Sequence, residues 1–250
     1  MAGARLFCLP YAGGGASAFA GWAAGLPSYI GVAAVQLPGR EERHGEVPYR
    51  RITNLVEVLA SQIAPHLDRP FVFYGHSMGA LIAFELTRQL RRCHLPMPQA
   101  LFLAAYPAPH LPLSRFAYHD LPDPELIGKM EELGRVGAGL LEHPELAEYA
   151  LPLLRADFEM CDTYRAAEEP PLDCAFVVLG GTADHHVSRD ELAAWRVHTR
   201  GPFQMEMMPG NHFFLQSCRP LLLEKLCSHL EKFSRPAGRR EGASSGDNRR

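Results

Sequence analysis

The chain has 250 residues, of which 47% are hydrophobic and 21% charged, and its formal net charge is -3. These values favour one α/β domain with an insertion and a large core, and they speak against a nucleic-acid partner, since phosphate binding needs a concentrated positive surface. The apolar runs are shorter than the ~20 residues that a membrane-spanning helix needs, and the N-terminus does not resemble a secretory signal. We therefore expect a cytoplasmic protein with no membrane partner.

Short apolar runs alternate with longer helical patterns along the chain, which predicts a mostly parallel sheet flanked by helices. Continuous apolar character is typical of strands that are buried on both faces. The predicted strands cover residues 6–9, 32–36, 71–74, 101–105, 176–179 and 203–208. The main predicted helices cover residues 52–67, 78–90 and 221–233, the last one introduced by Pro220.

The stretch between Tyr106 and Pro171 has no strand pattern and predicts a helical insertion at about 107–170. Asp123 is expected to cap a first helix with Pro124 at its first position, Gly134 to end it, and His143-Pro144 to open a second helix. The insertion is either a lid over an active site or an extra helical layer without a gating role.

The domain organisation follows from these patterns. Residues 1–235 are predicted to form a single domain that includes the insertion. Residues 236–250 are polar, rich in small side chains and poor in large apolar ones, so we expect a disordered tail.

The cysteines show neither CxxC pairs nor the His/Cys spacing of a metal site. Reduced thiols in a cytoplasmic protein are therefore expected, with no metal. The six residues are Cys8, Cys93, Cys161, Cys174, Cys218 and Cys227.

The strongest motif is the pentapeptide Gly75-His76-Ser77-Met78-Gly79, which lies between a predicted strand and a predicted helix. This G-x-S-x-G pattern in a strand–turn–helix context indicates a serine nucleophile on a sharp turn and predicts the α/β-hydrolase fold. Glycines are needed because the turn leaves no room for Cβ atoms on either side of the serine. Ser77 is the candidate nucleophile.

A serine hydroxyl needs a base, and the base needs an acid that orients it. His212 follows the last predicted strand, and Asp184 follows the strand before it, which gives the chain order Ser, Asp, His of this fold. Asp190 is the competing acid, but it falls where a helix starts and is better explained as a first-turn residue. The adjacent histidines His185 and His186 are interpreted as loop residues because no third ligand has metal spacing.

The oxyanion of the reaction needs two preorganised donors. The backbone N–H of Met78 is one candidate. The second is expected from the glycine-rich loop of residues 10–15, with the N–H of Ala12 as the candidate and that of Tyr11 as the alternative. A phosphate-binding loop is a weaker interpretation because the G-K-[ST] ending is missing.

Together, these motifs resemble the type II thioesterases that accompany nonribosomal peptide and polyketide synthases. The resemblance runs from about Leu6 to Phe233. The matching segments are Leu9-Pro10-Tyr11-Ala12-Gly13-Gly14, Gln36-Leu37-Pro38-Gly39-Arg40-Glu41, the serine pentapeptide, Ala156-Asp157-Phe158 with Tyr164, Gly180-Gly181 with Asp184, and His212-Phe213-Phe214.

The resemblance implies hydrolysis of acyl thioesters on the phosphopantetheine arm of a carrier protein, which clears stalled acyl groups or releases product. It implies Ser77, Asp184 and His212 as the catalytic triad, Ala12 and Met78 as oxyanion donors, the insertion as a lid, and no bound cofactor. A transient acyl or peptidyl carrier protein is the expected partner. The alternatives are an esterase or acyltransferase on small free substrates, and a non-catalytic protein that binds a synthase.

Three arginines, Arg88, Arg91 and Arg92, fall near the end of the helix that follows the serine. They suit an acidic carrier or the phosphate of its arm. A solvated helix end is the favoured explanation, because basic residues are stabilised near a helix C-terminus.

Overall fold

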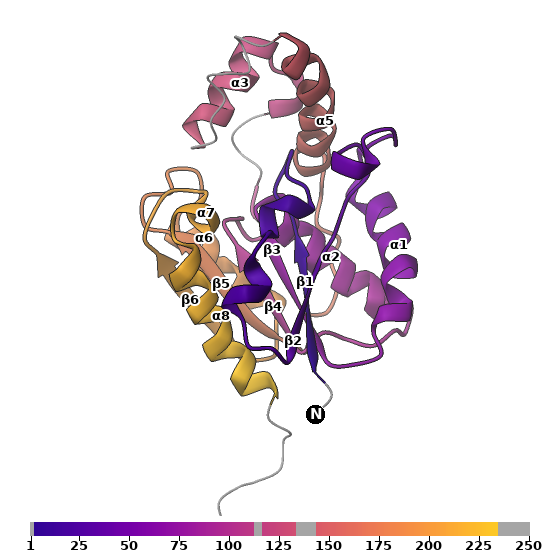
Figure 1. The fold of residues 1–250 in the computed structure, drawn as a ribbon, viewed down its shortest axis with the longest axis vertical. Helices are drawn as coiled ribbons and strands as arrows, with labels where there is room; N and C mark the ends of the chain where they lie inside the picture. Colours follow the sequence, from indigo (N-terminus) through magenta and orange to yellow (C-terminus); the bar gives the residue numbers. More distant parts are fainter. Residues whose placement is uncertain (1–2, 113–116, 134–143, 235–250) are drawn as a thin grey trace, which may run out of the picture.

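A computed structural model describes residues 3–112, 117–133 and 144–234 of the chain. In this part of the chain, parallel strands form one sheet in the order β2-β1-β3-β4-β5-β6 (Figure 1). The strands are β1 (Ala4–Leu9), β2 (Ile30–Ala34), β3 (Phe71–His76), β4 (Ala100–Ala104), β5 (Ala175–Gly181) and β6 (Phe203–Met208). The predicted α/β-hydrolase fold is thus confirmed, with every predicted strand present.

One strand is shifted from its predicted position. The prediction placed it at residues 32–36, whereas β2 ends at Ala34. Gln36 leaves the sheet because its side-chain oxygen accepts a hydrogen bond from Ala16 N at 2.7 Å and its amide donates to Arg40 O at 3.0 Å. A side chain that ties two loops together therefore ends the strand earlier than the apolar pattern indicates.

Helices pack on both faces of the sheet, as the continuously apolar strands predict. The helices of the described residues are α1 (Ile52–Ile63), α2 (Met78–Arg92), α3 (Asp123–Glu132), α5 (Pro144–Asp162), α6 (Arg189–Ala193), α7 (Phe214–Ser217) and α8 (Arg219–Ser234), of which α3 and α5 belong to the insertion. The predicted helix at 52–67 is α1 followed by a 3-10 turn, Ala64–His66. The predicted closing helix is α8, which begins one residue before Pro220.

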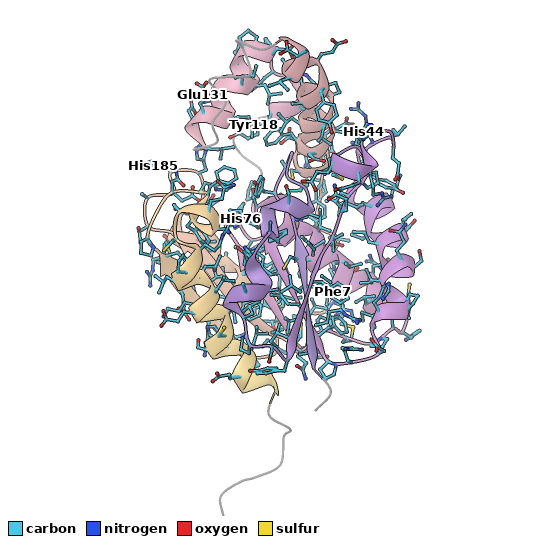
Figure 2. The ribbon with its side chains drawn as sticks, viewed as in Figure 1. Phe7, His44, His76, Tyr118, Glu131 and His185 are labelled. Atoms are coloured by element: carbon cyan, nitrogen blue, oxygen red, sulfur yellow. The ribbon has the colours of Figure 1, made fainter. Side chains whose placement is uncertain are left out.

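Alternation along the strands divides the core into two halves. Phe7 and Phe73 point to one face and pack with Leu55 of α1 and Leu81 of α2 (Figure 2 labels Phe7). On the opposite face, Tyr74 packs with residues of the 3-10 turns after β1 and of α8. The central strands β3, β4 and β5 are therefore buried along their whole length, whereas the outer strands β2 and β6 are partly exposed.

The helices α3 and α5 of the insertion stand above the carboxyl ends of the strands (Figure 1). No strand occurs among the described residues between Tyr106 and Pro171, in agreement with the prediction. The base of α5 is anchored to the body of the domain through Glu159, which pairs with Arg50 at 2.6 Å and Arg51 at 2.8 Å.

The predicted cap of the first insertion helix was wrong by one position. Pro122, not Asp123, is the N-cap residue of α3, and Asp123 is the first helical residue. The carboxylate of Asp123 pairs with Arg155 of α5 instead of capping its own helix. Gly134 and His143 lie outside the described residues, as does the predicted disordered tail.

The predictions of a cytoplasmic location and of a domain that ends at residue 235 remain predictions. All six cysteines lie in the described ranges, and none of them is in a disulfide. Within those same ranges, no helix combines the length and apolar character needed to cross a membrane. The predicted domain boundary at residue 235 directly follows the last described residue, Ser234.

Candidate active site

Ser77 lies on a sharp turn between β3 and α2. Its backbone has φ 53° and ψ -121°, an unfavourable conformation for a residue with a Cβ atom. The turn is held by Ser77 N, which donates to Ala104 O at 2.7 Å. A Cβ atom on Gly75 would collide with the backbone of Gly79, and one on Gly79 would collide with the carbonyl of Leu9. Both glycines of the pentapeptide are thus required by close backbone contacts.

His212 follows β6, and its imidazole reaches Ser77 across the carboxyl edge of the sheet. The distance from His212 Nε2 to Ser77 Oγ is 3.0 Å, and the distance from His212 Nδ1 to Asp184 Oδ2 is 2.8 Å. This geometry suits an imidazole whose Nδ1–H donates to Asp184 while Nε2 accepts the hydroxyl proton of Ser77. The structure therefore brings the three residues singled out in the sequence into one hydrogen-bonded chain.

Asp184 is held in place by more than His212. Its Oδ1 accepts hydrogen bonds from the backbone N–H groups of His186 at 2.8 Å and Val187 at 3.3 Å. Burial favours the neutral acid, but the hydrogen bonds from His212, His186 and Val187 outweigh burial and lower the pKa of Asp184 below its usual value. Asp184 is thus a fixed carboxylate at neutral pH. Asp190 is exposed in the first turn of α6, as expected.

The loops that carry Asp184 and His212 are joined to each other. Ala183 N donates to Gly210 O at 2.8 Å, and a Cβ atom on Gly181 would collide with the carbonyl of Asn211. These contacts set the spacing of the acid and the base before any side chain is considered.

His76, inside the pentapeptide, was not predicted to have a role. Its side chain is fully buried, and its Nε2–H donates to the backbone carbonyl of His212 at 2.8 Å. Tyr74 donates its hydroxyl to His76 Nδ1 at 3.2 Å, which fixes the tautomer. Burial lowers the pKa of His76 to about 3, so the ring is neutral. The only indication of this role in the sequence was the position of His76 next to Ser77. Because that position of the G-x-S-x-G motif is variable, the motif does not predict a role for its side chain.

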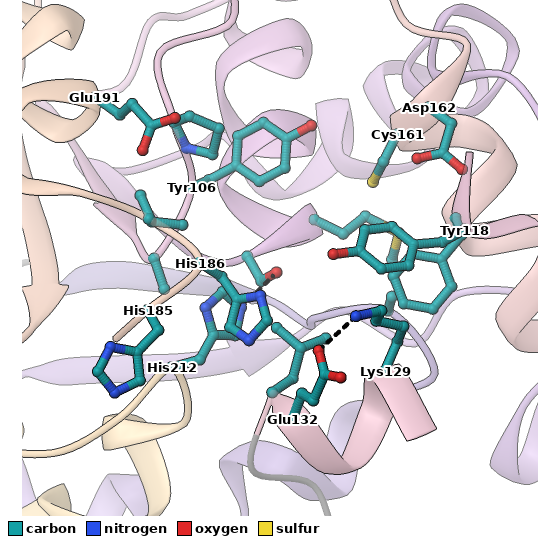
Figure 3. A pocket seen from close by; sticks show the side chains of 18 of the residues that line it. Tyr106, Tyr118, Lys129, Glu132, Cys161, Asp162, His185, His186, Glu191 and His212 are labelled. Atoms are coloured by element: carbon teal, nitrogen blue, oxygen red, sulfur yellow. Dashed lines mark hydrogen bonds and ion pairs between the residues drawn. The ribbon is translucent and has the colours of Figure 1, made fainter. Parts of the chain in front are cut away.

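A pocket of about 650 Å³ opens above Ser77 and His212. Its walls come from the sheet edge and from the insertion, and Figure 3 shows Tyr118 and Lys129 of the insertion facing His186 and His212 across it. Apolar side chains of the insertion and its flanks, among them Leu111, Leu133 and Phe158, form much of the wall. The hydroxyl of Ser77 therefore faces a cavity of the size that holds small ligands.

Ala12 and Met78, the candidate oxyanion donors, line the same pocket as Ser77. Met78 begins α2, so its N–H points out of the helix N-terminus. Tyr11, the alternative donor, has its ring buried against Phe213 at a centroid distance of 4.9 Å. The structure thus places the glycine-rich loop beside the serine.

His185 and His186 line the outer part of the pocket and belong to the loop after β5. In the described part of the chain, no three His, Cys, Asp or Glu side chains gather closely enough to hold a metal ion.

The three arginines of α2 differ from the solvated helix end that the sequence favoured. Arg88 is buried and pairs with Glu85 at 2.7 Å and with Glu169 at 2.9 Å. Arg91 and Arg92 also pair with Glu169, at 2.8 Å and 2.6 Å. Glu169 therefore ties the return segment of the insertion to α2, because it pairs with all three arginines of that helix.

A parallel sheet with a strained serine turn at its carboxyl edge, an acid and a histidine on the next loops, and a helical insertion above them define an α/β-hydrolase. The thioesterase domain model matches residues 4–234, and the chain belongs to this family.

The chain is similar to the gramicidin S biosynthesis protein GrsT of Aneurinibacillus migulanus, with 42% identity over 90% of this chain and 88% of the relative. It is also similar to two solved structures. RedJ, a thioesterase of the prodiginine pathway in Streptomyces coelicolor, has 40% identity and a TM-score of 0.83, covering 90% of this chain and 85% of its own. YbtT, a type II thioesterase of the yersiniabactin pathway, has 31% identity and a TM-score of 0.83, covering 93% and 94%.

Proposed function

We propose that the chain hydrolyses acyl thioesters carried on the phosphopantetheine arm of carrier proteins in a nonribosomal peptide or polyketide pathway. Such a reaction removes stalled acyl groups or releases product. The observation that carries the proposal is the chain of hydrogen bonds from Ser77 through His212 to Asp184, which opens into a largely apolar pocket. Membership of the thioesterase family and similarity to pathway thioesterases support it.

The reaction proceeds in two halves. Ser77 Oγ attacks the thioester carbonyl while His212 Nε2 takes the hydroxyl proton, and Asp184 stabilises the imidazolium that forms. The negative oxygen is stabilised by the N–H groups of Ala12 and Met78. Collapse of the tetrahedral intermediate breaks the C–S bond and leaves an acyl-Ser77 ester, with His212 supplying the proton to the departing thiolate.

Water completes the turnover. His212 removes a proton from a water molecule, which attacks the acyl-Ser77 carbonyl. The second tetrahedral intermediate then collapses to the free acid as the C–O bond to Ser77 breaks, and His212 returns the proton to Ser77 Oγ. These steps use side chains and backbone groups only. The absence of a cofactor, the transient nature of the carrier contact and the cytoplasmic location are parts of the same proposal.

The test is single-turnover hydrolysis of a set of acyl-phosphopantetheinyl carrier proteins by the wild-type chain and by Ser77→Ala. Release by the wild type alone supports the proposal, and the order of rates identifies the preferred acyl group. A matched small thioester without the carrier is the control. Equal rates on both would indicate an esterase of free substrates, and equal background release by wild type and Ser77→Ala would indicate a non-catalytic protein.

A further inference from the structure

A buried ion pair joins the insertion to the glycine-rich loop. The guanidinium of Arg40, from the segment after β2, meets the carboxylate of Asp157, from α5, through Nη1–Oδ2 at 2.9 Å and Nη2–Oδ1 at 2.8 Å. Arg40 is 3% exposed and Asp157 is 0% exposed. Burying two charges is costly unless their geometry is well satisfied. This pair therefore calls for an explanation beyond the general cohesion of the fold.

Both members of the pair also bind the backbone of the glycine-rich loop. Asp157 Oδ2 accepts a hydrogen bond from Gly13 N at 2.7 Å, and Arg40 Nη1 donates to Gly14 O at 3.0 Å. Gly13 has φ 68°, in the left-handed region that favours glycine. The backbone conformation that directs Gly13 N toward Asp157 is consequently unfavourable for most residues other than glycine.

The two residues that follow the loop, Ala16 and Ser17, are held by other side chains. Gln36 accepts a hydrogen bond from Ala16 N at 2.7 Å, and Glu41 accepts one from Ser17 Oγ at 2.5 Å. Residues 16 and 17 thus bind side chains of the segment after β2, whereas residues 13 and 14 bind the ion pair that includes Asp157 of α5. Ala12, which lines the pocket beside Ser77, is covalently joined to Gly13.

We infer that Arg40 and Asp157 are positioning residues: their direct contacts with Gly13 and Gly14 hold the glycine-rich loop so that Ala12 N–H meets the oxyanion. This inference rests on the proposed function, since it assigns the pair to the oxyanion step of that reaction. The insertion then acts in transition-state stabilisation as well as in forming the pocket wall. Neither side chain needs to touch the substrate.

The variant that isolates this role is Asp157→Asn. It keeps the size of the side chain, but it removes the charge that pairs with Arg40 and makes one of the two terminal atoms a donor, so the contacts with Arg40 and Gly13 N can no longer all form. Arg40→Lys keeps a positive charge and loses the planar fork that binds Asp157 and Gly14 together.

The matched control is Glu159→Gln, two residues further along α5. Glu159 pairs with Arg50 and Arg51 rather than with the loop. Its replacement weakens the anchoring of the same helix without touching Gly13 or Gly14. A general effect of loosening α5 would therefore appear in both Glu159→Gln and Asp157→Asn.

The readout compares two ketones with the same acyl chain. A trifluoromethyl ketone forms a tetrahedral adduct with Ser77 whose oxygen occupies the oxyanion site, whereas a methyl ketone reports ground-state binding. We expect Asp157→Asn to lower kcat on the acyl carrier and affinity for the trifluoromethyl ketone by about 10- to 100-fold each, because a displaced donor loses much of its effect. In Asp157→Asn, KM and the affinity for the methyl ketone should stay close to the wild-type values. The kcat and trifluoromethyl ketone affinity of Arg40→Lys should lie between those of wild type and Asp157→Asn, and those of Glu159→Gln should match wild type.

Equal losses for the two ketones, equal losses in Asp157→Asn and Glu159→Gln, or an unchanged kcat in Asp157→Asn would each overturn the inference. If Asp157→Asn fails to fold by circular dichroism, the double variant Arg40→Met with Asp157→Leu removes both buried charges and is expected to fold with the same selective loss. The ketone comparison needs no carrier. A wild-type chain that forms the adduct but does not hydrolyse acyl carriers would therefore contradict the proposed function alone.

Discussion

The neutral imidazole of His76 donates from Nε2 to the backbone carbonyl of His212, 2.8 Å away. His212, the candidate base, is therefore held from two sides, through its ring by Asp184 and through its backbone by His76. Figure 2 shows His76 at the upper end of the sheet, below the insertion that carries Tyr118.

The first prediction concerns acid stability. The pKa of His76 is about 3 in the folded chain because of burial, and it is near 6.5 when the chain is unfolded. Between these values the unfolded state binds more protons, so the free energy of unfolding decreases as the pH falls from 6.5 toward 3, by up to about 1.4 kcal/mol per pH unit for this one group.

His76→Gln removes this titration while retaining a donor. We expect urea titrations between pH 4 and pH 7 to show a shallower pH dependence for the variant than for the wild type. Parallel curves for the two proteins would mean that His76 is not neutral in the folded state.

The second prediction concerns the acid of the site. Asp184→Asn should lower kcat about ten-thousand-fold, because an amide in this place favours the tautomer of His212 that cannot accept the serine proton. Asp190→Asn is the control, since Asp190 is an exposed first-turn acid of α6 only six residues away in the sequence. Steady-state rates on an acyl carrier check both variants. A loss in Asp190→Asn comparable to that in Asp184→Asn would contradict the assignment.

The third prediction concerns the serine turn. Gly79→Ala should destabilise the chain by more than about 2 kcal/mol, because the new Cβ would collide with the backbone carbonyl of Leu9, which cannot move aside like a flexible side chain. Gly128→Ala in α3 is the matched control, since nothing lies within 4 Å of the new Cβ. There alanine should stabilise the helix by about 0.5 to 1 kcal/mol. Thermal unfolding measures both, and a neutral Gly79→Ala would refute the steric account.

The fourth prediction concerns the charges at the end of α2. The side chain of Arg88 is 3% exposed and that of Arg92 is 41% exposed, although both pair with Glu169. Arg88→Met leaves the buried Glu85 without its closest cation, and the free energy of unfolding should fall by about 3 to 5 kcal/mol. Arg92→Met should cost less than about 1 kcal/mol because water screens the exposed pair. Chemical denaturation distinguishes the two, and similar small losses would show that the Arg88 pair contributes little.

The local parts of the site could be predicted from the sequence because their chemistry is tied to short motifs. The serine turn needs glycine two positions before and two positions after Ser77, so the sequence pattern is nearly sufficient to predict the turn. Asp184 and His212 were found because parallel strands place their carboxyl ends at one edge of the sheet, which makes chain order a guide to spatial order. The same reasoning placed the glycine-rich loop beside the serine.

The parts that could not be predicted depend on contacts between residues far apart in the chain. Asp157 accepts a hydrogen bond from the N–H of Gly13, which lies 144 positions away in the sequence. No periodicity or motif spacing connects these two residues. Arg88 was predicted to be solvated because its local sequence is typical of an exposed helix C-terminus. It is buried because the return segment that carries Glu169 covers it. Asp123 was expected to cap its own helix, but Arg155 on the neighbouring helix takes its carboxylate.

The sequence alone therefore predicted the succession of strands and helices along the chain, the serine turn and the candidate acid and base, since these follow from local sterics, apolar periodicity and the direction of parallel strands. The tertiary structure decided which buried charges are paired, which histidine supports the base and how the insertion is connected to the glycine-rich loop. The physical reason is that a buried polar group must find a partner wherever the packed chain supplies one, and that partner is set by three-dimensional packing rather than by neighbours in the sequence.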